Sequence, residues 1–521
     1  MSYDPEQRLL LPPDLREWLP EEHLALFVSD VVEELDLQKI RDWYERGDGR
    51  GRPPYHPLMM VKLLVYGYCT GRVSSRKIEK ATYEDVAFRV LACNQHPDHD
   101  SLAEFRKTHL EELAELFAQV LRLCEQAGLV KLGHVAVDGS KLRANASKHK
   151  AMSYERMCAK EEQLAAEVER LLREAAATDE AEDQAYGKGR RGDELPAELA
   201  RRESRLRKIR EAKAALEAEA KEKAKAAAAV TQAKIEARKK REEETGKKTP
   251  GRRPQVVDAE AAKPEAKAQR NFTDPESRIM KDSATGSFEQ SYNAQIAVDG
   301  EAQIIVAANL TQEVNDKQQL VPMLTAVKDN LGRLPEKATA DAGYFSASAV
   351  TNEELSSVDL YVTPDSGRKT EETEEVELLA GEFATTTDEP VIEQMREKLK
   401  TEAGRAVYKQ RKLIVEPVFG QVKEVRGFRR FSFRGLQKNQ AEWALICLTH
   451  NLLKLFRQKT LPASRSKINK GRKTSLAFVQ KVAAYSQVLV AWIQGIVKID
   501  LEMILTDLFT SDALFVSSTT S

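Results

Sequence analysis

The chain has 521 residues, and its 81 Lys and Arg nearly balance its 82 Asp and Glu. This length allows more than one domain, and a charged fraction of 31% argues against an integral membrane protein. The five cysteines form no C-x-x-C pair, which argues against a structural zinc site or a disulfide framework. With no signal-peptide pattern and an apolar stretch from Phe478 that Lys481 interrupts, we expect a cytoplasmic protein without a membrane span.

Charge is distributed unevenly along the chain. Residues 405–473 hold 18 Lys and Arg against three Glu, whereas residues 371–402 hold eleven Asp and Glu. A basic block of this density favours a polyanionic partner, and a solvated tail is the alternative.

The N-terminal part reads as helical. Residues 1–50 predict short helices that lead to a Gly/Pro/Arg hinge at 47–57. Apolar runs on either side of a basic turn then predict an all-α domain over 51–130. Ser101 and Glu104 form a capping box that would start its long last helix. A helix-turn-helix-like DNA-binding module and an ordinary helical subdomain explain this region equally well.

An apolar, β-branched run at 134–138 predicts a buried strand that ends at Asp138, because Gly139 follows. The composition then changes to Ala, Glu, Lys and Arg. Residues 152–248 predict two long antiparallel helices, a coiled-coil-like hairpin, and a Pro/Lys/Ala linker follows at 249–269.

Strand signals return after the linker. Residues 291–311 predict a hairpin with its turn at Asp299-Gly300, and an amphipathic helix is expected at 315–332. Strands at 337–341 and 358–364 precede an acidic insertion at 365–402. Helices are then expected at 404–426 and 440–456.

Without the insertions, the order of these elements is that of an α/β ribonuclease-H-like core with a mixed five-stranded sheet. The domains expected are a helical segment at 1–50, the DNA-binding domain at 51–130, core at 131–150 and 271–460, the hairpin and linker at 151–270, and a basic linker and tail at 461–521. Such a core brings together Asp138, Asp341 and Glu416. Two Mg²⁺ ions bound there stabilise the attacking and leaving oxygens of phosphoryl transfer. Each aspartate, taken alone, also suits a turn, as does Asp299 in the same Val-Asp-Gly context.

Several long segments carry a family resemblance. DGSKLRANASKHKAMSYERM, SYNAQIAVDG, TADAGYF and the segment from Arg411 to Leu455 resemble bacterial insertion-sequence transposases of the DDE type. The resemblance covers roughly residues 50–160 and 270–457, and its closest branch is the one catalogued as type eleven-eighty-two, with an InsH-like N-terminal domain. It implies that Asp138, Asp341 and Glu416 are the catalytic, metal-binding triad, that Mn²⁺ can replace Mg²⁺, and that a homodimer assembles on DNA.

Related transposases place the glutamate in a Y-x-x-R-x-x-x-E-x-x-x-x-x-x-K signature. Here Tyr408, Arg411, Glu416 and Lys423 fit it except for one extra residue before Glu416. Spacing puts Lys412 on one helical face with Tyr408, Glu416 and Lys423, opposite an apolar stripe of Val407, Ile414, Val418, Val422 and Val425. Either Arg411 or Lys412 would then contact phosphate. Pro417 leaves open whether Glu416 starts the helix or lies within it.

Lys and Arg residues near these acids, together with Tyr408, are candidates for contact with DNA phosphates. For those at 408–423 the alternative is a solvated helix face. The candidates are Lys141, Arg143, Lys148, Tyr408, Arg411, Lys412, Lys423, Arg426, Arg429, Arg430 and Arg434. Phe428, Phe431 and Phe433 lie among the last four and suit either base stacking or packing under the sheet.

The expected function is DNA transposition. The protein would bind double-stranded DNA at terminal inverted repeats, cleave at each end and join the ends to target DNA. A ribonuclease-H-like nuclease without strand transfer is the first alternative. A non-catalytic, domesticated DNA-binding protein is the second, and the intact set of three acids argues against it.

Overall fold

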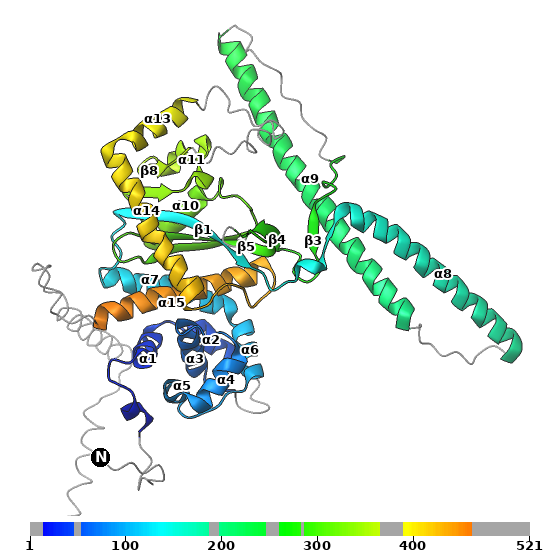
Figure 1. Cartoon of the computed structure of the whole chain (residues 1–521), viewed down its shortest axis with the longest axis horizontal. Coiled ribbons are helices and arrows are strands. Elements are labelled where there is room, and N and C mark those ends of the chain that lie inside the picture. Colours follow the sequence, from blue (N-terminus) through cyan, green and yellow to red (C-terminus); the bar gives the residue numbers. More distant parts are fainter. Residues whose placement is uncertain are drawn as a thin grey trace, which may run out of the picture. The chain divides into compact units, whose positions relative to one another are not determined.

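The computed structural model describes residues 14–45, 54–186, 197–245, 260–282, 286–364 and 389–460 (Figure 1). Most of the predicted hinge, the tip of the hairpin, most of its linker, most of the acidic insertion and the tail after residue 460 lie outside these ranges. No helix in the ranges described is both long enough and apolar enough to cross a bilayer.

The helices are η1 (Leu15–Trp18), α1 (Leu24–Glu34), α2 (Gln38–Glu45), α3 (Pro57–Cys69), α4 (Ser75–Glu84), α5 (Val86–Leu91), α6 (His99–Thr108), α7 (Leu110–Gln126), η2 (Lys148–Lys150), α8 (Tyr154–Tyr186), α9 (Ala197–Thr245), α10 (Leu320–Leu331), η3 (Ala342–Tyr344), α11 (Ala347–Val350), η4 (Glu353–Leu355), α13 (Glu389–Lys400), α14 (Glu402–Gly420), the π-helix η5 (Gln421–Val425) and α15 (Leu436–Thr460). The strands are β1 (His134–Arg143), β2 (Ala151–Ser153), β3 (Gln269–Asn271), β4 (Arg278–Lys281), β5 (Phe288–Asp299), β6 (Ile305–Thr311), β7 (Lys337–Ala340) and β8 (Asp359–Val362).

The helical N-terminal region differs from expectation in two details. Asp98, not Ser101, caps α6: its Oδ1 accepts a hydrogen bond from the Ser101 backbone N–H at 2.8 Å. The predicted long helix is also two helices, because the backbone at His109 leaves helical geometry between α6 and α7. A capping box read from sequence therefore placed the helix start three residues late.

The central sheet has the order β4-β5-β1-β7-β8, with β6 also paired to β5. In the described residues it thus has six strands, and the predicted count of five was wrong. The additional strand is β4. The long strand β5 pairs with β4 through Ser291 and with β6 from Asn293 onward, so one edge of β5 serves two short strands.

The first strand does not end at Asp138. It continues to Arg143 because β5 pairs with it antiparallel along this whole length, from Val135↔Asp299 to Arg143↔Ser291. Parallel pairing with β7 stops earlier, at Ala136↔Thr339. Asp138 therefore lies just beyond the point where β1 loses its β7 neighbour.

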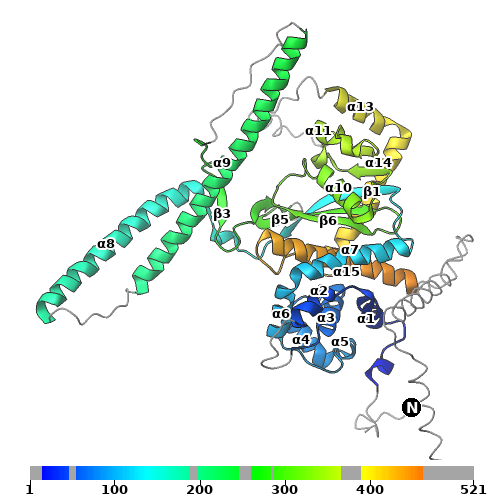
Figure 2. The same cartoon turned by 180° about the vertical axis from the view of Figure 1, so that it is seen from behind.

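Helices cover both faces of the sheet. Figures 1 and 2 show α14 and α15 near one another at the sheet, where Gln421, directly after α14, contacts His450 of α15, and they show α10 packed against β5 and β6. On the α15 side, Trp443 is fully buried and its Nε1 donates to the Gln295 carbonyl at 3.1 Å. Asn451 pairs with the backbone of Ile305 through both its amide nitrogen and its oxygen. These contacts fix α15 against β5 and β6.

The predicted hairpin turn at Asp299 is confirmed. Asp299 is 1% exposed, and its carboxylate accepts backbone N–H bonds from Lys131, Leu132 and Glu301. A carboxylate satisfied in this way by backbone donors has a structural role. Asp299 therefore belongs to the connection between α7, β5 and β6.

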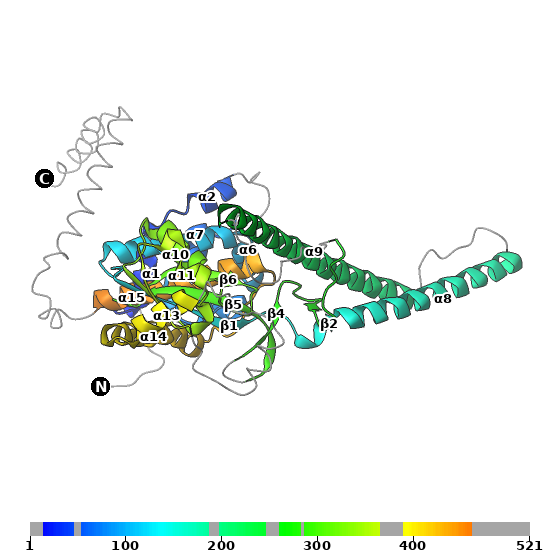
Figure 3. The same cartoon turned by 90° about the horizontal axis from the view of Figure 1, so that it is seen from above.

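The long helices α8 and α9 leave the core through a two-stranded sheet. β2 pairs antiparallel with β3, so both ends of the segment between them lie together, and β2 leads directly into α8 (Figure 3). The two helices share an apolar cluster of Met157, Leu164, Val168, Leu206, Ile209, Ala212 and Leu216.

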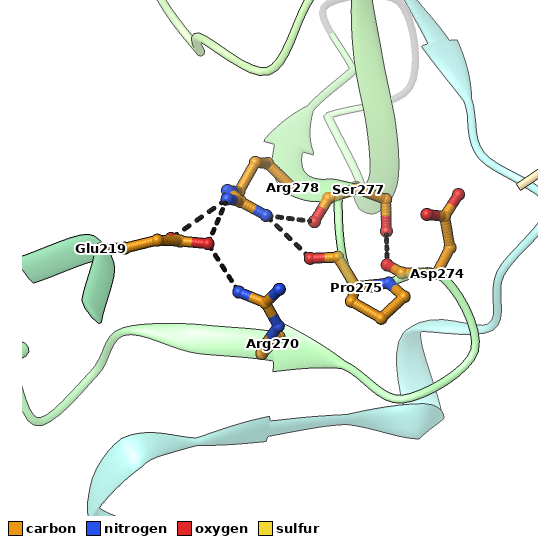
Figure 4. A network of polar contacts seen from close by, with 6 residues as sticks. All are labelled: Glu219, Arg270, Asp274, Pro275, Ser277 and Arg278. Atoms are coloured by element: carbon orange, nitrogen blue, oxygen red, sulfur yellow. Dashed lines mark hydrogen bonds and ion pairs between the residues drawn. The ribbon is translucent and has the colours of Figure 1, made fainter. Parts of the chain in front are cut away.

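An ion-pair network holds α9 to the strands at its base. Glu219 accepts hydrogen bonds from Arg270 Nη1 at 2.5 Å and from Arg278 Nη2 at 3.2 Å (Figure 4). Arg278 also donates to the carbonyls of Pro275 and Ser277. One carboxylate thus links α9 to β3 and β4.

Candidate active site

Strand register brings two aspartates to the same level. β1 and β7 run parallel with Ala136 opposite Thr339, so two residues further on Asp138 lies opposite Asp341. Asp341 directly follows β7, where it caps η3, and its Oδ1 accepts from the Gly343 N–H at 2.9 Å. The two carboxyl groups thus share one edge of the sheet.

Burial and mutual repulsion disfavour ionisation of this pair. The pKa of Asp138 is raised to about 6, first by burial and then by the negative charge of Asp341, while Arg411 opposes the shift. The pKa of Asp341 is also raised, again mainly by burial. Two half-buried carboxyl groups that lack sufficient positive charge form an environment suited to a cation.

Cationic side chains from α14, η5 and β1 lie at this edge. Arg411 Nη1 lies 3.5 Å from Asp138 Oδ2, and the Arg411 guanidinium lies 5.8 Å from the centre of the Tyr408 ring. Lys423, in η5, donates to Ser140 Oγ and to the Lys141 carbonyl. Lys141 Nζ in turn donates to the Val314 carbonyl at 2.8 Å.

Glu416 lies within α14, not at its start. Pro417 is tolerated there because the carbonyl four residues earlier, that of Leu413, accepts instead from Gln303 Nε2 at 2.9 Å. The Glu416 side chain is exposed, and Lys412 is exposed as well. The structure therefore places Arg411, and not Lys412, beside the aspartates.

The apolar face predicted for the helix at 404–426 is only partly buried. Ile414, Val418 and Val422 are buried, but Val425 is 78% exposed. The π-helical turn at 421–425 adds residues to the turn and rotates the positions after it out of the α-helical register. The predicted core position of Val425 was therefore wrong.

Four of the basic candidates lie where β1 meets the segment after η5, and Lys148 follows β1 in η2. Arg143 forms a bridge with Arg430, and its N–H donates to the Arg429 carbonyl. Arg430 Nη2 and Arg434 Nε donate to the Oδ1 and the backbone carbonyl of Asn145. Arg143, Lys148, Arg429, Arg430 and Arg434 are all exposed. We call these five residues the basic surface.

Arg426 does not belong to the basic surface. It is 5% exposed, and its guanidinium donates to the Ile446 carbonyl and to Thr449 Oγ1 within the core. The prediction that it contacts DNA was wrong, because the turn of η5 directs it inward against α15. Phe428 and Phe431 are also buried, against Tyr68 and Tyr292, which is the packing alternative. Phe433 lies beneath the Arg106 guanidinium, 5.0 Å from ring centre to Arg106 Cζ.

The sequence interpretation missed a further group at this edge, formed by Asp316, Asn293 and Gln295. Asp316 lies in the loop between β6 and α10, and its Oδ1 accepts from Asn293 Nδ2 at 2.6 Å and from Gln295 Nε2 at 2.7 Å. Both amides are fully buried in β5. Amide side chains inside an otherwise apolar buried strand require hydrogen-bond partners, and this was the available signal.

The residues suit a divalent cation, although no trio of His, Cys, Asp or Glu within the described ranges is already arranged as a metal site. Asp138 and Asp341 offer hard oxygen ligands from adjacent strands, which Mg²⁺ prefers. Burial and the negative charge of neighbouring acids raise the pKa of both carboxyl groups, and a bound cation would favour their ionised forms.

Comparison with known families agrees with this geometry. Residues 13–108 match the family described as Transposase domain (DUF772), and residues 219–452 match the Transposase DDE domain. No curated protein and no solved structure matches the chain significantly. The mixed sheet with helices on both faces, together with the DDE-domain match, is consistent with a ribonuclease-H-like core.

The chain belongs to the insertion-sequence transposases of the DDE class. It is therefore a metal-dependent DNA endonuclease and strand transferase. The DDE-domain match includes Asp341 and Glu416 but begins after Asp138, so the place of Asp138 in the site rests on the pairing of β1 with β5 and β7.

Proposed function

We propose that the protein moves its own element by binding the terminal inverted repeats, cleaving at each end and joining the ends to target DNA. Asp138, Asp341 and Glu416 are the proposed metal ligands, with two Mg²⁺ ions as the native cofactor and Mn²⁺ as a substitute. The observation that carries this proposal is the parallel register that puts Asp138 level with Asp341. Bound metal would activate the attacking oxygen and stabilise the leaving one.

Each side chain then has a defined task. Asp138 and Asp341 would hold the cation from neighbouring strands, and Glu416, exposed on α14, would complete the set. Arg411, which neutralises Asp138 when no cation is bound, would be free to contact a DNA phosphate once metal binds. Lys141 and Lys423 lie beside the same edge, where burial lowers the pKa of both amines.

The DNA-binding surfaces are a further part of the proposal. The basic surface on the core carries five exposed cations that would track the phosphate backbone near the cleavage site. In the N-terminal domain, α4 exposes Arg76 and Lys77 at its start, which supports its proposed role in recognising the element ends. Because two DNA ends must be paired, the proposed active form is a homodimer on DNA. Its proposed location is the cytoplasm, in association with the nucleoid.

The arm formed by α8 and α9 is proposed to be a helical hairpin that connects subunits. The branch called type eleven-eighty-two remains the proposed relationship within the family.

A strand-joining assay tests the proposed reaction. Linear DNA that carries the inverted repeats found beside the gene is incubated with the protein, a target plasmid and Mg²⁺, with EDTA as control. Breaks at the repeat ends together with joined donor-target products are expected. Breaks without joined products would identify a nuclease without strand transfer, and binding without breaks would identify a non-catalytic protein.

A further inference from the structure

Asp316 occupies a central position between the two aspartate-bearing segments. One oxygen, Oδ1, accepts from both Asn293 and Gln295 of β5, the strand that pairs with β1. The Oε1 atom of Gln295 accepts from the hydroxyl of Tyr344, three residues after Asp341. The Gln295 amide thus connects the Asp316 carboxylate with the turn that carries Asp341.

Two glycines leave the space that Asp316 fills. A Cβ at Gly139, next to Asp138, would lie 3.1 Å from Asp316 Oδ1 and against the amides of Asn293 and Gln295. A Cβ at Gly343 would lie 3.1 Å from Asp341 Oδ1 and 3.6 Å from Asp316 Oδ2. The loop after β6 therefore packs closely on the residues that follow both aspartates.

These contacts favour a positioning role over direct metal binding. Oδ1 is occupied by two amide donors, at 2.6 Å and 2.7 Å, from side chains that are fully buried. Hydrogen bonds from amides to a carboxylate are strong and directional. Oδ2 lies beside Gly343, 3.6 Å from where a Cβ at that position would be.

We propose that Asp316 is a positioning residue that sets the separation of the Asp138 and Asp341 carboxylates and thereby the affinity for divalent cation. This inference rests on the proposed role of those two aspartates as metal ligands. Outer residues that orient metal ligands typically change metal affinity by about 10- to 100-fold when they are altered.

Two variants separate geometry from charge. Asp316→Asn keeps an oxygen that accepts from Asn293 and Gln295 but removes the charge. Asp316→Glu keeps the charge but moves the carboxylate by one methylene toward Gly139 and Gly343. Asp316 is partly exposed in a loop, so we expect both chains to fold, and thermal melting checks this.

The readout is Mn²⁺ binding to the full chain without DNA, measured by calorimetry. We expect Asp316→Asn to bind Mn²⁺ nearly as the unmodified chain does, and Asp316→Glu to bind about tenfold or more weakly. Gly343→Ala, which adds a methyl group in contact with the Asp341 and Asp316 carboxylates, should also weaken Mn²⁺ binding. Gly133→Ala has open space around it and is the matched control. If Asp316→Glu fails to fold, Gly343→Ala still carries the test.

Two results would overturn the proposal: unchanged binding in Asp316→Glu and Gly343→Ala, or a loss in Asp316→Asn as large as that in Asp316→Glu. Asp138→Asn distinguishes a different failure. If Asp138→Asn binds Mn²⁺ as the unmodified chain does, the proposed metal site itself is wrong.

Discussion

Arg411 on α14 lies 3.5 Å from the carboxylate of Asp138 on β1, across 273 positions of sequence that include the whole α8–α9 arm. Both side chains are largely buried, with 12% and 20% of their surfaces exposed. Arg411 offsets only part of the cost of burying the Asp138 carboxylate, because the pKa of Asp138 is still raised to about 6. The arginine therefore provides the positive charge of the site when no cation is present.

Arg411→Ala should reduce cleavage of repeat-end DNA by about tenfold or more, because a preorganised cation beside the reacting phosphate is lost. Lys412→Ala is the matched control, since the Lys412 side chain is next in sequence and exposed. A gel-based cleavage assay in Mg²⁺ compares the two. Equal losses, or a larger loss in Lys412→Ala, would return the signature's basic position to Lys412.

Asp138→Asn should stabilise the metal-free protein at neutral and alkaline pH. The pKa of Asp138 is raised to about 6, so its ionised form opposes folding above that pH. Below about pH 4, the ordinary pKa range of an aspartate, Asp138 is protonated in both the folded and the unfolded chain and costs no stability. As the pH rises through about 6, its ionisation lowers the free energy of unfolding by an amount on the order of 1–3 kcal/mol. Melting in EDTA from pH 4 to pH 8 tests this.

In that experiment the variant should exceed the unmodified chain in melting temperature at pH 8 and match it near pH 4. Excess Mg²⁺ should raise the melting temperature of the unmodified chain more than that of the variant, because cation binding favours the folded state. If Asp138→Asn is less stable than the unmodified chain at pH 8 in EDTA, then ionised Asp138 does not destabilise the metal-free protein, contrary to this prediction.

Arg426 and Arg430 should behave in opposite ways. Arg426→Ala removes a buried guanidinium together with its hydrogen bonds to the Ile446 carbonyl and to Thr449 Oγ1, so a loss of about 1–3 kcal/mol of stability is expected. Arg430→Ala should leave stability unchanged and weaken DNA binding, with a salt dependence reduced by about one phosphate contact. Urea melts and binding isotherms at several salt concentrations distinguish them. Weaker DNA binding by a stable Arg426→Ala would reverse the assignment.

Replacing residues 155–265 with a short Gly/Ser linker should leave the core folded. β2 and β3 pair at the base, Ser153 opposite Gln269, so a few residues suffice to close the gap. The shortened chain should bind a single DNA end and fail to pair two ends, if the arm connects subunits. Circular dichroism and native gels with one or two ends provide the readouts.

Glu219→Gln offers a milder version of the same experiment. It weakens the ion pairs with Arg270 and Arg278 at the base of the arm without shortening the chain.

For the chain that lacks residues 155–265, unfolding would show that the arm belongs to the core. Unchanged pairing of two DNA ends would remove the proposed role of the arm in assembly.

Much of this fold was predictable because its signals are local. The strands at 291–311 and 358–364 and the helix at 315–332 carry clear apolar periods, and Asp299-Gly300 marks the turn. The errors have tertiary causes. Gly139 was expected to end β1, yet β5 pairs with the strand to Arg143. β4 is only four residues long, and its partner strand decides its conformation.

The site was predictable only as far as sequence order carries it. The order of strands and helices identified Asp138 and Asp341, because register then aligns them. Which side of α14 faces them depends on Pro417 and on the π-helical turn, and these change the register that a regular 3.6-residue period assumes. Asp316 follows no motif and joins the site through buried amides on β5.

Cleavage of repeat-end DNA in Mg²⁺ by Asp138→Asn, Asp341→Asn and Glu416→Gln tests the central claim most directly, with DNA binding measured in parallel. Glu424→Gln is the control, because Glu424 is an exposed acid in η5 that pairs with Arg429. The three variants should lose cleavage by more than about 100-fold while they retain DNA binding, which rests on phosphate contacts. The control should cleave normally. Retained cleavage in any of the three would remove that residue from the metal site, and retained cleavage in Asp138→Asn would contradict the account as a whole.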